Sequence, residues 1–304
     1  MKNVWISLVL AGVAAWAWAG QAWGAMDDVP EGVFVEEVAA EEEEWPEVSE
    51  EALRREVGDE AAARRLMARV RSGVPSQPLG MEATIKALSA EGRTIGRLRA
   101  QVTYRPDTTD PSVRDATYAV LSPDGREEAA VMSIRLPSGE GGAPVFRYEC
   151  PPGVATEVPD LFAPLEGTDL CWMELSFSFL FWARPRIVGT EVLRKRWTCQ
   201  IVELDAPEGM AGAGGAEGWD RLRLWVAPTY GAVVQGVALR GGDEVKRFNV
   251  ESVTRVRHTY MVSDMLVRSV GKGTRSRLKI GGLELLAPEY TPEQRAVMDG
   301  PVAW

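Results

Sequence analysis

Few side chains in this sequence have the chemistry and spacing that catalysis needs. His258 is the only histidine, so the chain cannot build a typical zinc site and offers a single imidazole as a base near neutral pH. It stands between Arg257 and Thr259 near a strand junction, where we expect an ordinary surface residue. No Gly-x-Ser-x-Gly elbow occurs, and the glycines at 212–215 are not followed by the Lys-Ser/Thr of a phosphate loop. The sequence therefore predicts no catalytic residue, no cofactor and no metal site.

Paired carboxylates are harder to exclude, because the chain has 44 acidic residues. Glycosidases hold two carboxyl groups at a fixed separation in a cleft. Asp169 and Glu174 would meet in such a pair, beside tryptophans able to stack on a sugar. The alternative is structural, with Asp169 capping the segment and Glu174 paired with an arginine. We favour the structural alternative and expect a protein that is not an enzyme.

Three cysteines, Cys150, Cys171 and Cys199, allow one disulfide and leave one thiol over. Cys150 and Cys171 flank a proline-rich stretch, which makes them the plausible couple in an oxidising compartment. Buried free thiols are the other possibility, and the sequence does not decide between them. No Cys-x-x-Cys motif is present.

The stretch 170–182 is the most unusual part of the chain, because it is apolar on nearly all sides. A helix capped by Thr168 or Asp169 would place four side chains on one face: Trp172, Leu175, Phe179 and Trp182. A strand would instead point Phe177, Phe179 and Phe181 the same way. With either structure the segment must be buried or line a cavity.

The N-terminal residues 1–24 have the pattern of a secretory signal peptide. Lys2 precedes an apolar run over 4–19, and small residues place cleavage after Ala19, Gly24 or nearby. The alternative is an uncleaved anchor, but the run is shorter than the ~20 apolar residues that span a bilayer. We expect export across the inner membrane to the periplasm, with no integral membrane segment left after cleavage.

Residues 25–48 are expected to form an acidic linker, since they hold most of the charge excess that gives the chain a net charge of −10. This balance disfavours nucleic acid as a partner, because phosphates would be repelled. A one-sided helix follows over 49–72, with Ser49 as its cap and an interruption at Gly58-Asp59. Residues 287–304 are expected to be a C-terminal tail.

Most of the domain expected over 49–286 alternates between apolar and polar residues, as strands of a half-wetted sheet do. We expect about eleven strands joined by short turns into an antiparallel meander, a mainly β (α+β) fold. The loop 209–218, rich in glycine and alanine, is expected to be a mobile hairpin tip. The candidate strands lie within 81–87, 97–104, 116–121, 129–136, 145–150, 186–192, 196–204, 222–226, 232–239, 245–256, 260–270 and 274–280.

Several motifs resemble the outer-membrane lipoprotein-sorting protein family, whose fold is that of the LolA and LolB lipoprotein carriers. The resemblance covers roughly 78–280 and is most specific in the block 167–182. Its segments are Asp160-Leu161-Phe162-Ala163-Pro164, Gly167-Thr168-Asp169, the aromatic run 172–182, Val188-Gly189-Thr190-Glu191, 199–204, 223–226, Phe248-Asn249-Val250 and 261–265.

The resemblance implies an incomplete antiparallel β-barrel of about eleven strands, with helices covering its open side. It further implies a non-enzymatic periplasmic carrier or chaperone that holds lipid or lipoprotein acyl chains in an apolar cavity, or a scaffold or sensor of the same fold that binds an envelope protein. The expected cavity residues are Trp172, Leu175, Phe177, Phe179, Phe181, Trp182, Trp197 and Trp225. Such bulky side chains would either line the cavity or fill it, and both possibilities stay open.

Overall fold

The computed structural model describes residues 49–286 with short gaps at 76, 108–109, 111–112, 123–124, 138–141, 195–196, 209, 211–217 and 257–258. The expected signal peptide (1–24), acidic linker (25–48) and C-terminal tail (287–304) lie outside the described residues. His258 and most of the glycine-rich loop 209–218 also lie outside them.

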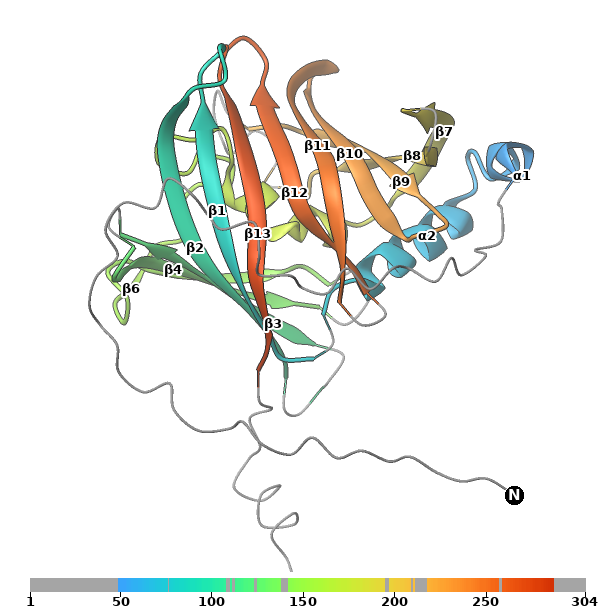
Figure 1. Ribbon diagram of the computed structural model, residues 1–304. Helices are drawn as coiled ribbons and strands as arrows, with labels where there is room; N and C mark the ends of the chain where they lie inside the picture. Colours follow the sequence, from blue (N-terminus) through green and yellow to red (C-terminus); the bar gives the residue numbers. More distant parts are fainter. Residues whose placement is uncertain are drawn as a thin grey trace, which may run out of the picture. The chain divides into compact units, whose positions relative to one another are not determined.

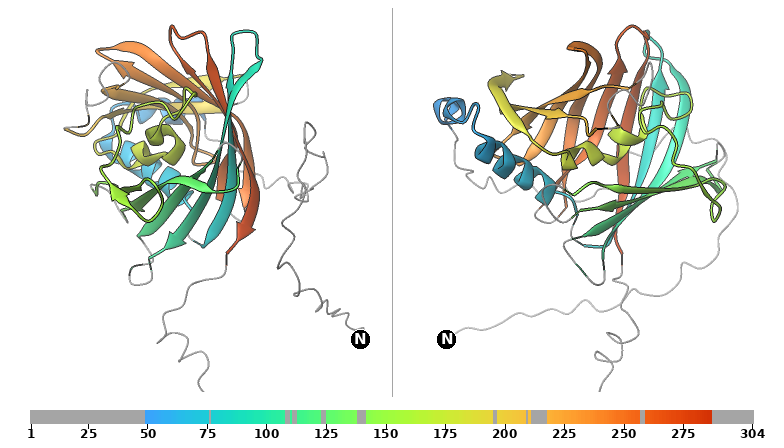
Figure 2. Two further views of the ribbon diagram at one scale, coloured as in Figure 1. Left: turned by 90° about the vertical axis from the view of Figure 1, so that its left-hand side faces the viewer. Right: turned by 180° about the vertical axis from the view of Figure 1, so that it is seen from behind.

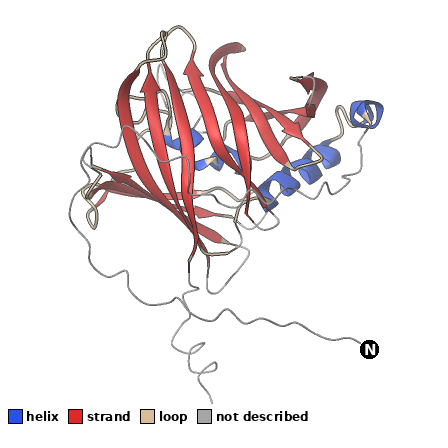
Figure 3. Ribbon diagram, in the orientation of Figure 1, coloured by secondary structure: helices blue, strands red, loops and turns tan. Residues whose placement is uncertain are grey.

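The described part is mainly β and forms one antiparallel sheet of 13 strands (Figure 3). The strands are β1 (Leu79–Leu88), β2 (Thr94–Pro106), β3 (Arg114–Leu121), β4 (Glu128–Leu136), β5 (Val145–Glu149), β6 (Ala155–Thr156), β7 (Arg186–Leu193), β8 (Trp197–Asp205), β9 (Arg221–Ala227), β10 (Ala232–Arg240), β11 (Asp243–Val256), β12 (Thr259–Ser269) and β13 (Arg275–Leu285). The described sheet has slightly more strands than the expected number of about eleven. One reason is that β6 has two residues, too few for a period-two pattern to reveal it.

Strand β1 shows why the alternating sequence forms this sheet. Met81, Ala83 and Ile85 are buried on the concave face, while Glu82 points to the other face and is exposed. Successive side chains in a strand point to opposite faces, so one apolar face and one polar face follow directly from the alternation.

The strand order explains the path of the whole chain. β1 and β13 are neighbours in the middle of the sheet, with Ile85 opposite Leu278, while β6 and β7 are its two edges. Strands β1 to β6 are therefore added one after another from the middle of the sheet to one edge. Strands β7 to β13 then run from the other edge back to the middle. Residues 157–185 must connect the two edges, and we call this segment the crossover. It runs across the concave face of the curved sheet (Figures 1 and 2), which confirms an open half-barrel.

Two helices precede the sheet, as predicted, and are separated at Gly58-Asp59. Ser49 caps α1 (Glu50–Arg55) and Asp59 caps α2 (Glu60–Ser72) through side-chain bonds to backbone N–H groups. The apolar face of α2 is buried, and Arg71 Nη1 donates to the carbonyl oxygen of Leu180 in the crossover at 3.1 Å. The helix packs beside edge strand β7 on the open side of the sheet (Figure 1).

The aromatic stretch is helical and not a strand. It forms α3 (Trp172–Ser176) and a 3-10 turn, η1 (Ser178–Phe181), separated by Phe177 in the left-handed conformation with φ of 52°. The cap is Cys171, whose N–H donates to the Glu174 carboxylate at 2.9 Å, so the predicted cap at Thr168 or Asp169 is wrong. Because the helix breaks at Phe177, the four predicted side chains do not share one continuous helical face.

Candidate functional site

An apolar cavity of about 120 Å³ lies between the crossover and the concave face of the sheet. Ligand pockets usually measure about 300–1,000 Å³, so this cavity in its present form has room for a short apolar group or part of a longer chain. Its walls come from α2 and the loop after it, from eight strands and from the crossover. They consist of Val70, Gly73, Val74, Pro75, Met81, Ala83, Val102, Tyr104, Tyr118, Leu136, Leu175, Ser176, Phe177, Leu180, Phe181, Gly231, Ala232, Val233, Val253, Met261, Val262 and Ile280.

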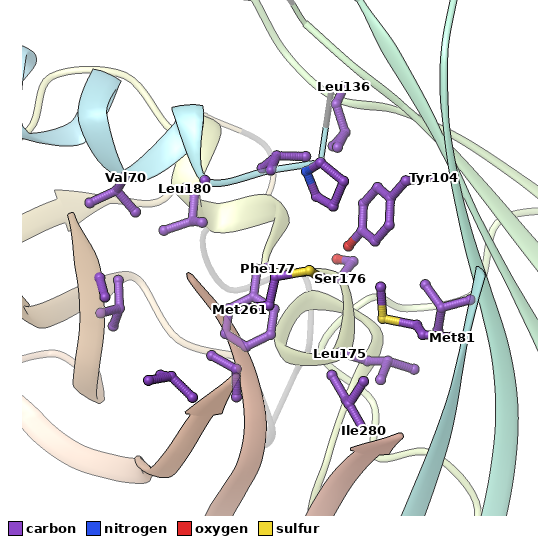
Figure 4. A pocket seen from close by; sticks show the side chains of 18 of the residues that line it. Val70, Met81, Tyr104, Leu136, Leu175, Ser176, Phe177, Leu180, Met261 and Ile280 are labelled. Atoms are coloured by element: carbon purple, nitrogen blue, oxygen red, sulfur yellow. The ribbon is translucent and has the colours of Figure 1, made fainter. Parts of the chain in front are cut away.

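The fold gathers these walls from distant parts of the sequence. Met81 from β1 and Ile280 from β13 lie beside Leu175 of α3, and Met261 from β12 lies beside Phe177 (Figure 4). None of the described lining residues carries a charge. The cavity therefore suits an uncharged, apolar group, because a charge buried there would have no partner.

One polar spot interrupts the apolar wall. The hydroxyls of Tyr104 and Tyr118 lie 2.8 Å apart, and the Tyr118 hydroxyl lies 3.4 Å from the carbonyl oxygen of Ser176, to which it can donate. Removal from water raises the pKa of both phenols, that of Tyr118 most, so both are neutral at physiological pH. Tyr104 belongs to the alternating run of β2, so the sequence placed it on the inward face but gave no reason to single it out.

A second cavity of about 350 Å³ lies next to the first, and Phe181 lines both. Its other walls include Phe146, Met173 and Trp182. Phe181 therefore contacts both cavities, and the second is by itself within the usual range of volumes for a ligand pocket.

A buried polar cluster fixes the crossover to the sheet. Lys246 of β11 donates to Glu174 at 3.0 Å, with both side chains almost fully buried. The backbone N–H of Asp169 donates to Ser276 of β13 at 2.7 Å, and Thr274 donates to the Asp169 carboxylate at 3.1 Å. Glu174 thus pairs with a lysine and not with the predicted arginine, because β11 brings Lys246 beneath α3. These carboxylates have structural contacts and do not face the cavity.

The three cysteines are free, so the plausible Cys150–Cys171 pair is not formed. Cys150 is exposed, whereas Cys171, the cap of α3, is buried in the main core and Cys199 lies on the outer face of the sheet. Burial raises the pKa of Cys171 far above its usual value and that of Cys199 to about 12. The thiols of Cys171 and Cys199 are therefore unreactive.

The structure separates the predicted cavity residues into three groups. Leu175, Phe177 and Phe181 line the first cavity. Trp182 borders the second cavity. Trp172 and Phe179 pack in the core, and the ring centroids of Phe179 and Phe248 are 5.8 Å apart. The two remaining residues, Trp197 and Trp225, lie elsewhere.

Trp197 and Trp225 belong to a smaller apolar cluster on the outer face of the sheet, with Cys199. The reason is strand alternation: Leu224 and Val226 point into the core, so Trp225 between them points out. The indole N–H of Trp225 donates to Glu191 at 2.7 Å on that face. Neither tryptophan lines the cavity.

Among the described residues, no group of three or more histidine, cysteine or acidic side chains could hold a metal ion. In the same part of the chain, no helix is both long and apolar enough to cross a membrane.

The architecture and cavity together define a class: an open antiparallel half-barrel whose concave face holds a helical crossover, the LolA-like fold. No protein-family model and no curated protein matches the sequence. Solved structures do match, at identities that establish the fold alone, so the fold implied by the motifs is confirmed.

Three similar structures illustrate the match. A DUF1329 family protein from Desulfovibrio piger has a TM-score of 0.61 and 14% identity, covering 79% of this chain and 97% of its own. A structure from Vibrio parahaemolyticus, described as an outer membrane lipoprotein-sorting protein domain, has a TM-score of 0.60 and 10% identity. The match covers 79% of this chain and 99% of the Vibrio chain. A LolA superfamily protein from Nitrosomonas europaea has a TM-score of 0.52 and 10% identity, and the match covers 75% of this chain and 94% of the Nitrosomonas chain.

Proposed function

We propose that this chain is a non-enzymatic periplasmic protein that binds lipid or lipoprotein acyl chains in its cavity and takes part in outer-membrane lipoprotein sorting. The observation that carries the proposal is the uncharged apolar cavity on the concave face of an open half-barrel. Burial of a hydrocarbon chain there would be favourable at roughly 25 cal/mol per Å² of apolar surface. The similarity in fold to a structure described as a lipoprotein-sorting domain supports the same proposal.

Within this proposal, Leu175, Phe177 and Phe181 are the crossover residues that contact the chain. Acyl chains longer than the 120 Å³ cavity would require Phe181 to rotate and join the second volume.

The test is native mass spectrometry and lipid extraction of the protein purified from its native compartment. We expect a bound lipid mass that is lost in Val262→Phe, because Val262 lines the cavity and a phenyl ring there would occupy the ligand's space. Affinity for an acyl ligand should fall roughly tenfold or more.

The matched control is Val188→Phe, since Val188 is an exposed valine of β7 and lies outside the cavity. This variant should retain lipid like the unmodified chain. The proposal fails if the purified protein shows only its own mass and binds no added acyl ligand.

A further inference from the structure

The cavity holds a single polar spot, and its hydrogen bonds leave one group free to serve a ligand. Only Tyr104, Tyr118 and Ser176 contribute polar side chains to the described lining. The Ser176 hydroxyl is engaged with Ser178 at 2.9 Å and with the carbonyl oxygen of Met173 at 3.5 Å. The two phenols are therefore the polar groups that remain.

Each phenol has one proton, and two arrangements are possible. If Tyr104 donates to Tyr118, which donates to the carbonyl oxygen of Ser176, the oxygen of Tyr104 keeps a free lone pair. If Tyr118 donates to Tyr104 instead, the proton of Tyr104 is free to donate. In both arrangements Tyr104 can form one further hydrogen bond, and its hydroxyl points into the cavity toward Ser176 (Figure 4).

The surroundings decide which ligand groups fit this spot. No lysine, arginine or acidic residue is among the described lining residues, and both phenols stay neutral. A carboxylate or ammonium placed there would lose its hydration without gaining a charged partner, which is strongly unfavourable. A hydroxyl or an amide N–H group loses less on burial and can bond to Tyr104 in either arrangement. An ester, which has no proton to donate, bonds to Tyr104 in the second arrangement, where the Tyr104 proton is free.

We propose that Tyr104 determines specificity by hydrogen-bonding an uncharged polar group of the bound chain, so that the cavity selects esters, amides and alcohols over ionised fatty acids. The inference rests on the proposed function, since it presumes that a hydrocarbon chain enters the cavity. Acyl chains attached through ester or amide links have this neutral chemistry, whereas free fatty acids are ionised at neutral pH.

The experiment compares four probes of equal chain length: decanol, methyl decanoate, decanoate and decane. Their dissociation constants are measured at neutral pH for the full chain by displacement of an apolar fluorescent dye. We expect decanol and methyl decanoate to bind more tightly than decane, and decanoate to bind most weakly. In Tyr104→Phe the advantage of decanol over decane should fall roughly two- to tenfold, which is one hydrogen bond.

Tyr148→Phe is the matched control, because Tyr148 packs against Trp172 outside the cavity lining. It should leave all four affinities unchanged. Decane binding also serves as a folding check, since Tyr104→Phe keeps the ring and should bind decane as the unmodified chain does.

The possible outcomes separate the inference from the proposed function. Decanoate binding as tightly as decanol, or an unchanged preference in Tyr104→Phe, would overturn the role of Tyr104 while leaving a chain-binding cavity. Failure of every probe to bind, decane included, would contradict the proposed function itself.

Discussion

Lys246 and Glu174 form an ion pair in the interior, where both charges are removed from water. Burial is the largest single influence and lowers the pKa of Lys246, but Glu174, Cys171 and Asp169 together outweigh it and raise the pKa above its ordinary value. Glu174 also accepts the N–H of Cys171, so the pair connects the cap of α3 to strand β11. Such a pair is costly to break because the partner that remains is an unpaired buried charge.

We expect Lys246→Met to lower the free energy of unfolding by about 3–5 kcal/mol, measured by urea denaturation. The double variant Lys246→Met/Glu174→Gln should recover part of this loss, because glutamine keeps an acceptor for Cys171 without a charge. Arg54→Met is the control, since the Arg54–Glu50 pair is exposed and should contribute less than about 1 kcal/mol. Equal stability of Lys246→Met and the unmodified chain would contradict the prediction.

The same pair has a defined pH dependence. A lysine whose pKa is raised on folding contributes stability that is complete below the pKa of the unfolded chain, ~10.4. That contribution declines as the pH rises above this value toward the pKa of the folded state. The difference between the unmodified chain and the double variant should therefore be constant near neutral pH and shrink in alkaline solution.

At the scale of the elements, a glycine in strand β10 leaves the space that a contact between the sheet and the crossover needs. Gly236 lies opposite Phe248 of β11, and a Cβ atom at Gly236 would overlap the Phe248 ring. The ring of Phe248 in turn packs against Phe179 of η1. The absence of a side chain at Gly236 therefore lets an aromatic ring lie flat over the strand and contact the crossover.

Gly236→Ala is expected to destabilise the protein by about 1–3 kcal/mol, because the added methyl group displaces the Phe248 ring from a packed core. Thermal unfolding followed by circular dichroism would measure the effect. Gly281→Ala is the control, since Gly281 lies in β13 and a methyl group added there would have nothing within 4 Å. If both variants unfold at the same temperature, the close approach at Gly236 has no energetic role.

At the scale of the whole molecule, the pairing of β1 with β13 joins the two halves of the sheet. The register places Ile85 opposite Leu278, and both are fully buried. These strands come from the beginning and the end of the described sheet, so neither half has a complete core without the other. We expect the halves to unfold together in one cooperative transition.

Leu278→Ala tests this expectation and should cost about 2–5 kcal/mol. The tryptophans of the described residues all lie in the crossover and β8–β9 region, so their fluorescence reports on that part, while amide hydrogen exchange of β2 and β3 reports on the other half. Both signals should shift to the same lower denaturant concentration. Leu285→Ala, at an exposed leucine of the same strand, should change stability by less than about 0.5 kcal/mol. Two separate transitions in Leu278→Ala would show that the halves fold independently.

Local patterns in the sequence determined most of the elements. Alternation predicted the strands, and Ser49 and the Gly58-Asp59 break predicted the two helices. These features depend on neighbours within a few residues, which is why they can be read without the fold. The resemblance of the block 167–182 to a known family predicted the class of fold, which periodicity alone would not have predicted.

Only the tertiary structure decided what those elements bring together. The partner of Glu174 is 72 residues away, and Tyr118 meets Ser176 only because the crossover runs along the concave face from one sheet edge to the other. The same path decided which aromatics line the cavity and which fill the core. Alternation turned Trp197 and Trp225 outward, although their hydrophobicity alone had made them candidates for the interior. Contacts between residues far apart in the sequence depend on strand order, and strand order leaves no local signal.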